Sequence, residues 1–548
     1  MKPNTLRRFQ TLHTWVGLMA GWALFIAFFA GAITVFHHEL HAWQAPERTA
    51  ARLAPPAVSG PEVDRFMQKL VAEWPDAAAS TYLSFPEPGE PGFTAFWMDK
   101  AGTWHHTNSE KLESTVPAKH LDTSLERSRS DLASFLDALH YSLGLDTPGM
   151  YFMGVISVLY GLALVSGVLL HLPRLTKDLF AVRPGRNLKR FWMDAHNVIG
   201  LFSLPFHLIF AITGALFCLS MVLLMALDTL TFDGKLMGAV PRITAASPEV
   251  QAAGRAVPTL PTTQLLAIAR AESGQGFAPA SIRFQHFGDA NAIAEIRGDS
   301  VRALGNYGSI GIHAASGEPR AGAVISNQTA AGRDTNHGLY SALYALHFGT
   351  FGDLGVRLVY LIAGLAGAFL FYSGNILWIE SRRKTRQAEQ PRVHRLLAQA
   401  TVGVCIGSCI GIALCFPAAL LWPERATALT YYPVWGVAIV WALLRPPVRA
   451  AVELLVMAAL AALSIPVSNA VLTGDHVLRA AASGHWAVAG FDIGAIALAV
   501  GFLALAHATL RRAHQGPAHS VWAIPGTPSA PPTAASTARS ALPDVDAS

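Results

Sequence analysis

Long apolar stretches dominate this chain, and most of them have the length of a membrane-spanning helix. About 20 consecutive apolar residues carry an α-helix through the hydrocarbon layer of a bilayer. Eight runs approach this length, and Pro433 interrupts the sixth. The runs cover residues 14–36, 150–172, 198–227, 354–379, 396–421, 426–444, 450–472 and 486–509. The pattern therefore predicts a polytopic α-helical membrane protein.

Two long polar segments separate some of these runs. In the first, residues 80–85 and 93–98 alternate like strands, with a turn at 99–102. In the second, residues 262–272 have helical spacing and are followed by three strand-like stretches. Those stretches are 281–284, 292–297 and 309–313. Each polar segment is expected to form a separate small α+β module outside the membrane.

Basic residues indicate the orientation, because short cytoplasmic loops retain Lys and Arg. Arg7 and Arg8 precede the first run, and basic clusters follow the second and fourth runs. Both chain ends are therefore expected in the cytoplasm. This distribution explains the net charge of +5, so no nucleic-acid partner is inferred. Hydrophobic residues make up 52% and charged residues 14% of the chain, a balance that excludes an ordinary soluble protein.

These observations divide the chain into eight parts. In order, they are a first transmembrane helix that is an uncleaved signal anchor (1–40), an external module (41–149), the second and third transmembrane helices with a basic cytoplasmic loop (150–228), a second external module (229–336), the fourth transmembrane helix (337–380), a basic cytoplasmic loop (381–395), four C-terminal transmembrane helices (396–510) and a disordered cytoplasmic tail (511–548).

The first four runs carry a duplicated pattern of histidine and glycine. His13 opens the first run and His196 the third, and each is followed by a glycine four residues later and by a Gly-Ala pair fourteen residues after that glycine. The matching positions are Gly17 and Gly200, Gly31 and Gly214, His140 and His347, and the Ser-Gly pairs ending at Gly167 and Gly374. A duplicated helix pair therefore predicts a four-helix core.

Histidines on facing helices are suited to hold haem iron from both sides. Polar side chains inside a membrane are costly, so a repeated set of them calls for a function. We predict His13 and His196 as iron ligands near the cytoplasmic surface, with His171 as a competitor. The candidates for an outer haem are His140, His347 and His207, with His37 as a weaker candidate. If His196 and His207 share one helix, their spacing of eleven residues returns them to nearly the same face.

Four glycines lie near the histidine faces, where a missing side chain would let a porphyrin approach the backbone. They are Gly17, Gly31, Gly200 and Gly214. The alternative is that these glycines serve helix packing, as small residues often do in membranes.

The chain resembles the PepSY-associated transmembrane family, which includes inner-membrane ferric-siderophore reductases. The resemblance rests on the stretches 13–17 and 31–36, 166–174, 194–200 with 213–214, and 346–374. It implies two PepSY-like external modules on a four-helix core in the bacterial inner membrane, with two haem b groups. The activity it implies is outward electron transfer that reduces a periplasmic ferric siderophore or other ferric chelate.

The expected partners are membrane lipid, the ferric chelate and an electron donor. The chain has no glycine-rich dinucleotide fingerprint after a strand, so the donor is expected to be a cytoplasmic protein or a quinol. Two other functions remain open. One is a haem-free binding or regulatory protein of the cell envelope, and the other is a metal transporter that uses the histidines as its pathway.

Overall fold

The computed structural model describes residues 3–44, 59–86, 92–109, 132–172, 188–237, 249–273, 277–300, 304, 308–325, 335–383, 390–423, 425–515 and 520–524. Most of these residues are helical. The helices are α1 (Pro3–Thr34), α2 (His37–Gln44), α4 (Gly60–Glu73), α6 (Leu132–Ser142), α7 (Asp146–His171), α9 (Leu188–Phe202), α10 (Leu204–Thr231), α12 (Thr262–Ser273), α13 (Thr335–Phe348), α14 (Leu354–Ser381), α15 (Arg392–Leu421), α16 (Ala428–Leu444), α17 (Pro447–Thr473), α18 (Val477–Ala482) and α19 (Trp486–Gln515).

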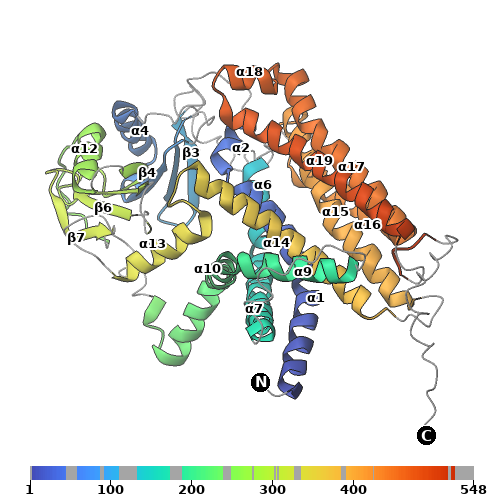
Figure 1. The fold of residues 1–548 in the computed structure, drawn as a ribbon. Helices are drawn as coiled ribbons and strands as arrows, with labels where there is room; N and C mark the ends of the chain where they lie inside the picture. The colour runs from blue at the N-terminus through green and yellow to red at the C-terminus, as the bar shows by residue number, and fades with distance from the viewer. Residues whose placement is uncertain are drawn as a thin grey trace, which may run out of the picture.

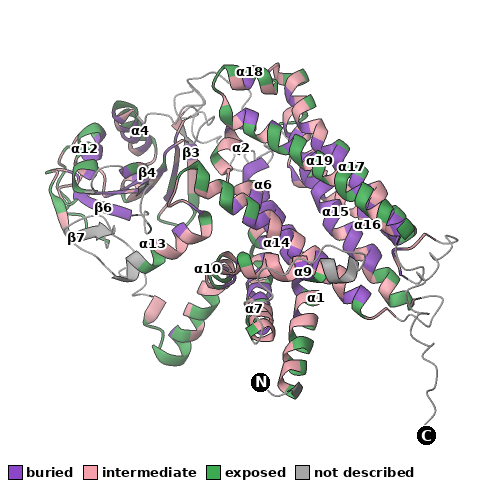
Figure 2. Cartoon of the chain, viewed as in Figure 1, coloured by how far each residue is buried: buried purple, intermediate pink, exposed green. Residues whose placement is uncertain are grey.

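Seven helices in the described part of the chain are long and apolar enough to cross a membrane, so the chain is a multi-pass membrane protein. They are α1, α7, α10, α14, α15, α17 and α19. The eighth predicted span is the 17-residue helix α16, which at about 1.5 Å per residue is shorter than the hydrocarbon layer. Figure 2 shows long exposed stretches on α10, where Met221, Val222 and Leu223 are open to the surroundings.

The third predicted span is broken, which corrects the expectation that His196 and His207 share one helix. Helix α9 ends at Phe202 and α10 begins at Leu204. The cause is Pro205, which has no N–H to donate and whose ring would clash with the carbonyl four residues earlier. His196 therefore lies on α9 and His207 on α10, and the two helices run in different directions (Figure 1).

The histidine-bearing helices pack as a core around α1. Helix α1 contacts α7, α14 and the short helix α6, while α10 packs on α7 and α9 packs on α14. Glycines allow the close approach of α14 to α1: a methyl group at Gly364 would lie 2.8 Å from Cβ of Ala32, and one at Gly367 would lie 2.4 Å from the Phe28 ring.

The sequence predicts two separate modules, but the two polar segments together form one antiparallel sheet of seven strands. Its order is β3-β2-β1-β4-β5-β6-β7. The strands are β1 (Ser80–Ser84), β2 (Thr94–Met98), β3 (Trp104–Asn108), β4 (Phe277–Gln285), β5 (Ile293–Ser300), β6 (Gly308–His313) and β7 (Pro319–Ile325). The segments join where β1 pairs with β4, from Ser80 opposite Gln285 to Ser84 opposite Ser281.

Burial of edges and of apolar side chains explains this joining. An unpaired strand edge exposes backbone donors and acceptors, and pairing β1 with β4 removes one such edge from each segment. Helices α4 and α12 lie together beside the sheet (Figure 1), and apolar residues of both segments form one core. Asp64 of α4 also accepts hydrogen bonds from the backbone N–H and hydroxyl of Thr262, the first residue of α12.

Helices α6 and α13 belong to the membrane helices rather than to the sheet, although the predicted boundaries put α6 in the first module. Leu132, Leu136 and Leu139 of α6 are buried in the same apolar cluster as α1. The predicted basic loops lie largely outside the described residues, at 173–187 and 384–389, and so does most of the predicted tail.

The C-terminal helices pack on one another and on α2. Helix α15 contacts α16 and α17, and α17 contacts α19 (Figure 1). A buried polar network joins them at one end: Asn469 donates to Asp492 at 2.7 Å, and the indole N–H of Trp43 on α2 donates to the same carboxylate at 3.2 Å. Trp43 also packs edge-on against Phe416 of α15.

Candidate functional site

The first pair of repeated histidines packs against the repeated Ser-Gly pairs. Nδ1 of His13 on α1 lies 2.8 Å from the carbonyl oxygen of Ala163 on α7, and a methyl group at Gly167 would lie 3.1 Å from its ring. Nδ1 of His196 on α9 lies 3.2 Å from Oγ of Ser373 on α14, with Gly374 at the corresponding place. His13 and His196, which are equivalent in the repeat, therefore make equivalent contacts in the two halves of the chain.

The second pair packs against the Gly-Ala end of the first helix in each half. Nδ1 of His140 on α6 lies 2.8 Å from the carbonyl oxygen of Ala27 on α1. A methyl group at Gly31 would lie only 2.5 Å from that nitrogen, so the ring fits because position 31 has no side chain. Nδ1 of His347 on α13 lies 2.6 Å from Oγ1 of Thr213 on α10.

The hydrogen bonds fix the tautomer of two rings and are compatible with the same tautomer in the other two. A carbonyl oxygen only accepts, so His13 and His140 carry their proton on Nδ1. The Ser373 hydroxyl donates to the carbonyl of Leu370 at 3.1 Å, and the Thr213 hydroxyl donates to the carbonyl of Ile209 at 2.6 Å. With its proton engaged in this way, each hydroxyl accepts from the histidine, and the lone pair of the neutral ring then lies on Nε2.

The histidines gather at two levels. His196 lies near His13, His171 and His207, and His13 also lies near His171; we call His13, His171 and His196 the N-terminal cluster. His140 and His347 form the second group, with ring centres 5.8 Å apart and planes at 49°, and we call this pair the sheet-side cluster. The structure places His13, His171 and His196 near one another and pairs His140 with His347, whereas His207, the third outer candidate, is not part of that pair.

His207 is placed differently from the other candidates. It is fully buried, and both ring nitrogens are engaged, with Nδ1 2.5 Å from the Tyr160 hydroxyl and Nε2 2.8 Å from Ser203 Oγ. Ser203 donates its own proton to the carbonyl of Ile199, so Nε2 is the donor and Tyr160 donates to Nδ1. The ring also packs 5.8 Å from Phe28.

The four predicted glycines have different surroundings. Gly31 makes room for His140, and a methyl group at Gly214 would lie 2.8 Å from the Ser157 hydroxyl. At Gly200 the nearest neighbour would be Leu370 at 3.7 Å, and at Gly17 no atom would lie within 4 Å. Sequence reasoning did not assign Ser373, Thr213 or Tyr160 a role, although the repeat of Ser-Gly at 166–167 and 373–374 was a usable signal.

The spacing of His140 and His347 is compatible with two imidazole ligands on opposite faces of one metal ion. A metal–imidazole bond is about 2 Å long, so two imidazoles on opposite faces of one iron have ring centres roughly 6 Å apart, close to the spacing of His140 and His347. Within the described ranges, no three His, Cys, Asp or Glu side chains are grouped to hold a bare metal ion.

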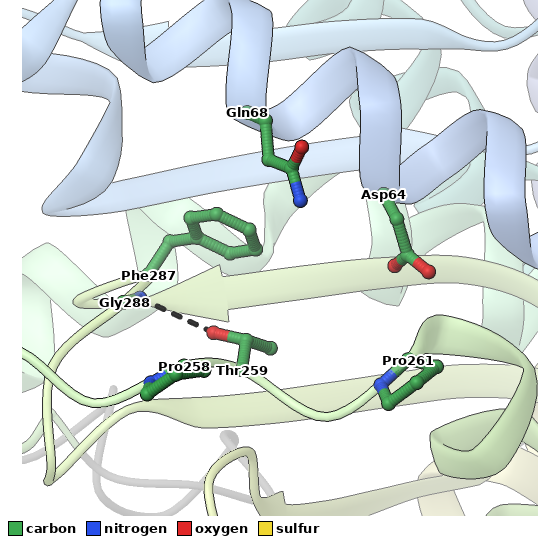
Figure 3. A pocket seen from close by; sticks show the side chains of 7 residues that line it. All are labelled: Asp64, Gln68, Pro258, Thr259, Pro261, Phe287 and Gly288. Carbon is green, nitrogen blue, oxygen red and sulfur yellow. Dashed lines mark hydrogen bonds between the residues drawn. The ribbon is translucent and has the colours of Figure 1, made fainter.

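The sheet together with helices α4 and α12 is called the sheet domain here. It contains a cavity of about 320 Å³ next to α12. Figure 3 shows its lining, formed by Asp64, Gln68, Pro258, Thr259, Pro261, Phe287 and Gly288. Asp64 is the ionisable side chain here, and it already accepts from Thr262. This carboxylate therefore ties α4 to α12, and neither histidine cluster borders the cavity.

A titratable pair lies at the hairpin between β2 and β3. The carboxylate of Asp99 accepts from the backbone N–H groups of Ala101 and Thr103, and its other oxygen lies 2.8 Å from Nε2 of His105. The bond with His105, followed by those with the backbone, lowers the pKa of Asp99. The turn predicted at 99–102 is confirmed, with Gly102 at φ +82°.

Comparison with known proteins places these clusters in a shared region. The family model described as "PepSY-associated TM region" matches residues 10–381, a stretch that includes both histidine clusters and the sheet. Uncharacterized protein PA4219 of Pseudomonas aeruginosa is 29% identical over 332 residues, which cover 56% of this chain and 79% of that protein. The C-terminal helices from α15 onward lie outside the family match.

Proposed function

From the premise that the chain belongs to the family of proteins with a PepSY-associated TM region, we propose that it is a transmembrane electron-transfer protein that reduces a ferric chelate. Two haem b groups are its cofactors, one at each histidine cluster. A ferric siderophore is the substrate we favour. The sheet domain then faces the periplasm of a bacterial inner membrane, with both chain ends in the cytoplasm.

The observation that carries the proposal is the shared hydrogen bonding of Nδ1 in four histidines. His13, His140, His196 and His347 each use Nδ1 for a hydrogen bond to the protein, and donation from Nδ1 leaves the lone pair of Nε2 for a metal. Metal-bound histidines typically have this arrangement, in which the second nitrogen fixes ring orientation and raises ligand basicity.

The residues of each cluster would hold, orient and shield the cofactor. We assign His140 and His347 to the sheet-side iron, and His196 with either His13 or His171 to the other. Haem bound at these places supplies a one-electron Fe(III)/Fe(II) couple. His207 packs with Phe28 and Tyr160, and Phe371 packs on both of those rings, so these side chains form an aromatic layer in the core.

The direction of transfer follows from the proposed orientation. A quinol or a cytoplasmic protein donates electrons near the N-terminal cluster, and the ferric chelate accepts them near the sheet-side cluster. Each ferric ion takes up one electron and leaves as Fe(II), because the reduced ion is held less firmly by hard oxygen ligands. A quinol donor would reduce two ferric ions and release two protons.

Stopped-flow mixing of the dithionite-reduced protein with ferric siderophores tests this function. We expect the reduced haem bands to decay, with one Fe(II) trapped by a ferrous-specific chelator for each haem reoxidised. His347→Ala should slow this reaction at least ~10-fold, since it removes a ligand rather than an outer contact. His514→Ala, at the exposed end of α19, should react like the parent protein.

Two results would contradict the proposal. One is a His347→Ala protein that reduces chelates as fast as the parent. The other is a haem-loaded protein that no ferric chelate reoxidises. A haem-free preparation with metal-dependent uptake would instead favour the transporter alternative.

A further inference from the structure

Helix α2 places two histidines side by side at the sheet-side end of α1. His37 and His41 are separated by four residues, so they share one face of the helix. Their Nε2 atoms lie 3.1 Å apart. Two nitrogens bound to one metal at about 2.0–2.1 Å would be roughly 2.9–3.4 Å apart for angles between 90° and tetrahedral. The pair therefore already has the spacing of two ligands of one ion.

A carboxylate supports this pair from a neighbouring helix. Nδ1 of His37 lies 2.9 Å from Oδ2 of Asp137 on α6. The nearby carboxylate favours the tautomer of His37 with its proton on Nδ1, in which Nε2 has the lone pair. In the metal-free state His41 donates its own Nε2–H to that lone pair. When a metal ion binds, the proton of His41 moves from Nε2 to Nδ1, and the ion takes its place between the two Nε2 atoms. Both rings stay neutral, so no proton is lost.

Contacts on both sides fix α2 in position. The Arg357 guanidinium of α14 forms a bidentate ion pair with Glu39 and also donates to the carbonyl of Val35. At the far end, Trp43 is buried between Phe416 and the Asp492 carboxylate. A ligand pair on a helix held at both ends is preorganised, which lowers the entropic cost of binding.

The site is open to solvent and adjoins the sheet-side cluster. The side chains of His37 and Asp137 remain 27% and 39% exposed. Asp137 and His140 are three residues apart on α6, about one helical turn. With two protein ligands, an ion here keeps several positions for water or for the oxygen atoms of a chelate. Such a site exchanges its ion readily.

We propose that His37 and His41 bind a divalent first-row transition-metal ion, with Asp137 as the residue that orients His37. The metal site stands on its own geometry. Its use for Fe(II), as the first protein site for the ion released by reduction, rests on the proposed function. Imidazole nitrogen suits Fe(II) and Zn(II), and the order of affinities for divalent ions predicts that Zn(II) binds more tightly.

Calorimetric titration of the oxidised full-length protein, purified through a tag without histidines and free of siderophore, tests the site. Zn²⁺ and, without oxygen, Fe²⁺ are the probes. We expect one Zn²⁺ per chain at this site, weaker binding as the pH falls because protons compete for imidazole, and loss of that binding in His41→Ala. His514→Ala is the matched control and should bind like the parent protein.

Asp137→Asn keeps an acceptor for His37 but removes the charge, so we expect 10–100-fold weaker binding of Zn²⁺. This variant also decides the question if His41→Ala does not fold. Equal Zn²⁺ binding by the parent, His41→Ala and Asp137→Asn proteins would overturn the site, as would no binding by the parent. Neither result bears on the proposed reduction of ferric chelates, because that reaction is measured without added Zn²⁺ or Fe²⁺. If the protein binds the metal but reduces no ferric chelate, the metal site stands, and its proposed role in receiving the released Fe(II) is wrong.

Discussion

At the residue scale, three of the four repeated histidines, His13, His140 and His196, each pack against a glycine of another helix. The sequence revealed both members of these pairs as a repeat, but it suggested that the glycines admit a porphyrin. At Gly31 the occupant of the space is the His140 ring. Side-chain contact between segments more than 100 residues apart is set by tertiary packing, and periodicity in one sequence carries no information about it.

Gly31→Ala tests this pairing. The added methyl group would lie 2.5 Å from Nδ1 of His140, so the ring must move away from the Ala27 carbonyl. We expect a destabilisation of about 1–3 kcal/mol from overpacking and the loss of roughly half of the bound haem. Haem-to-protein ratio and thermal unfolding measure the two effects.

Gly490→Ala on α19 is the control, because no atom would lie within 4 Å of its methyl group. It should keep its haem and be unchanged or slightly more stable, since alanine favours helix by up to ~1 kcal/mol over glycine. A Gly31→Ala protein with full haem content and unchanged stability would show that His140 does not depend on this glycine.

At the element scale, the apolar runs predicted the long helices well because membrane helices carry a strong and continuous signal. The helix 262–272 and the turn at 99–102 were also predicted correctly, since both depend on local chemistry. The break at Ser203 was missed, although Pro205 is a local cause that the sequence displays. Strand β7 was missed as well: residues 319–325 contain Pro319, Gly322 and two alanines, which weaken a strand pattern.

The hairpin at Asp99 predicts how acid affects stability. Because the pKa of Asp99 is lowered in the folded protein, its carboxylate stabilises the fold above the ordinary pKa of about 4. This contribution is lost as the pH falls through the lower folded value. Asp99→Asn should therefore unfold at a lower temperature than the parent at pH 7, and the difference should shrink as the pH drops below about 4.

Thermal unfolding followed by tryptophan fluorescence measures this, because Trp74 and Trp97 pack on His105. Glu73→Gln, at an exposed position near the end of α4, is the control and should show no such convergence. A difference between Asp99→Asn and the parent that stays constant down to acid pH would rule out the carboxylate as its source.

At the scale of the whole molecule, the two halves of the duplicated region contact each other in two places. In the membrane helices they bring equivalent histidines together, and in the sheet they join through β1 and β4. The sequence showed the first duplication through its histidines and glycines. It did not show that the polar segments share one sheet, because strand pairing between distant segments depends on which edges are left to cover. No role for the C-terminal helices followed from the sequence. In the structure, Asp492 and Phe416 of these helices contact Trp43 and so help to fix α2.

The most direct test of the account is the haem content and spectrum of the purified full-length protein from haem-replete cells. We predict two haem b per chain, a Soret band and the low-spin α and β bands of bis-histidine iron on reduction. His196→Ala and His347→Ala should each lose about one of the two groups, as expected for ligands of separate irons. A folded, full-length protein without a Soret band, or variants of both histidines that keep two haems, would contradict it.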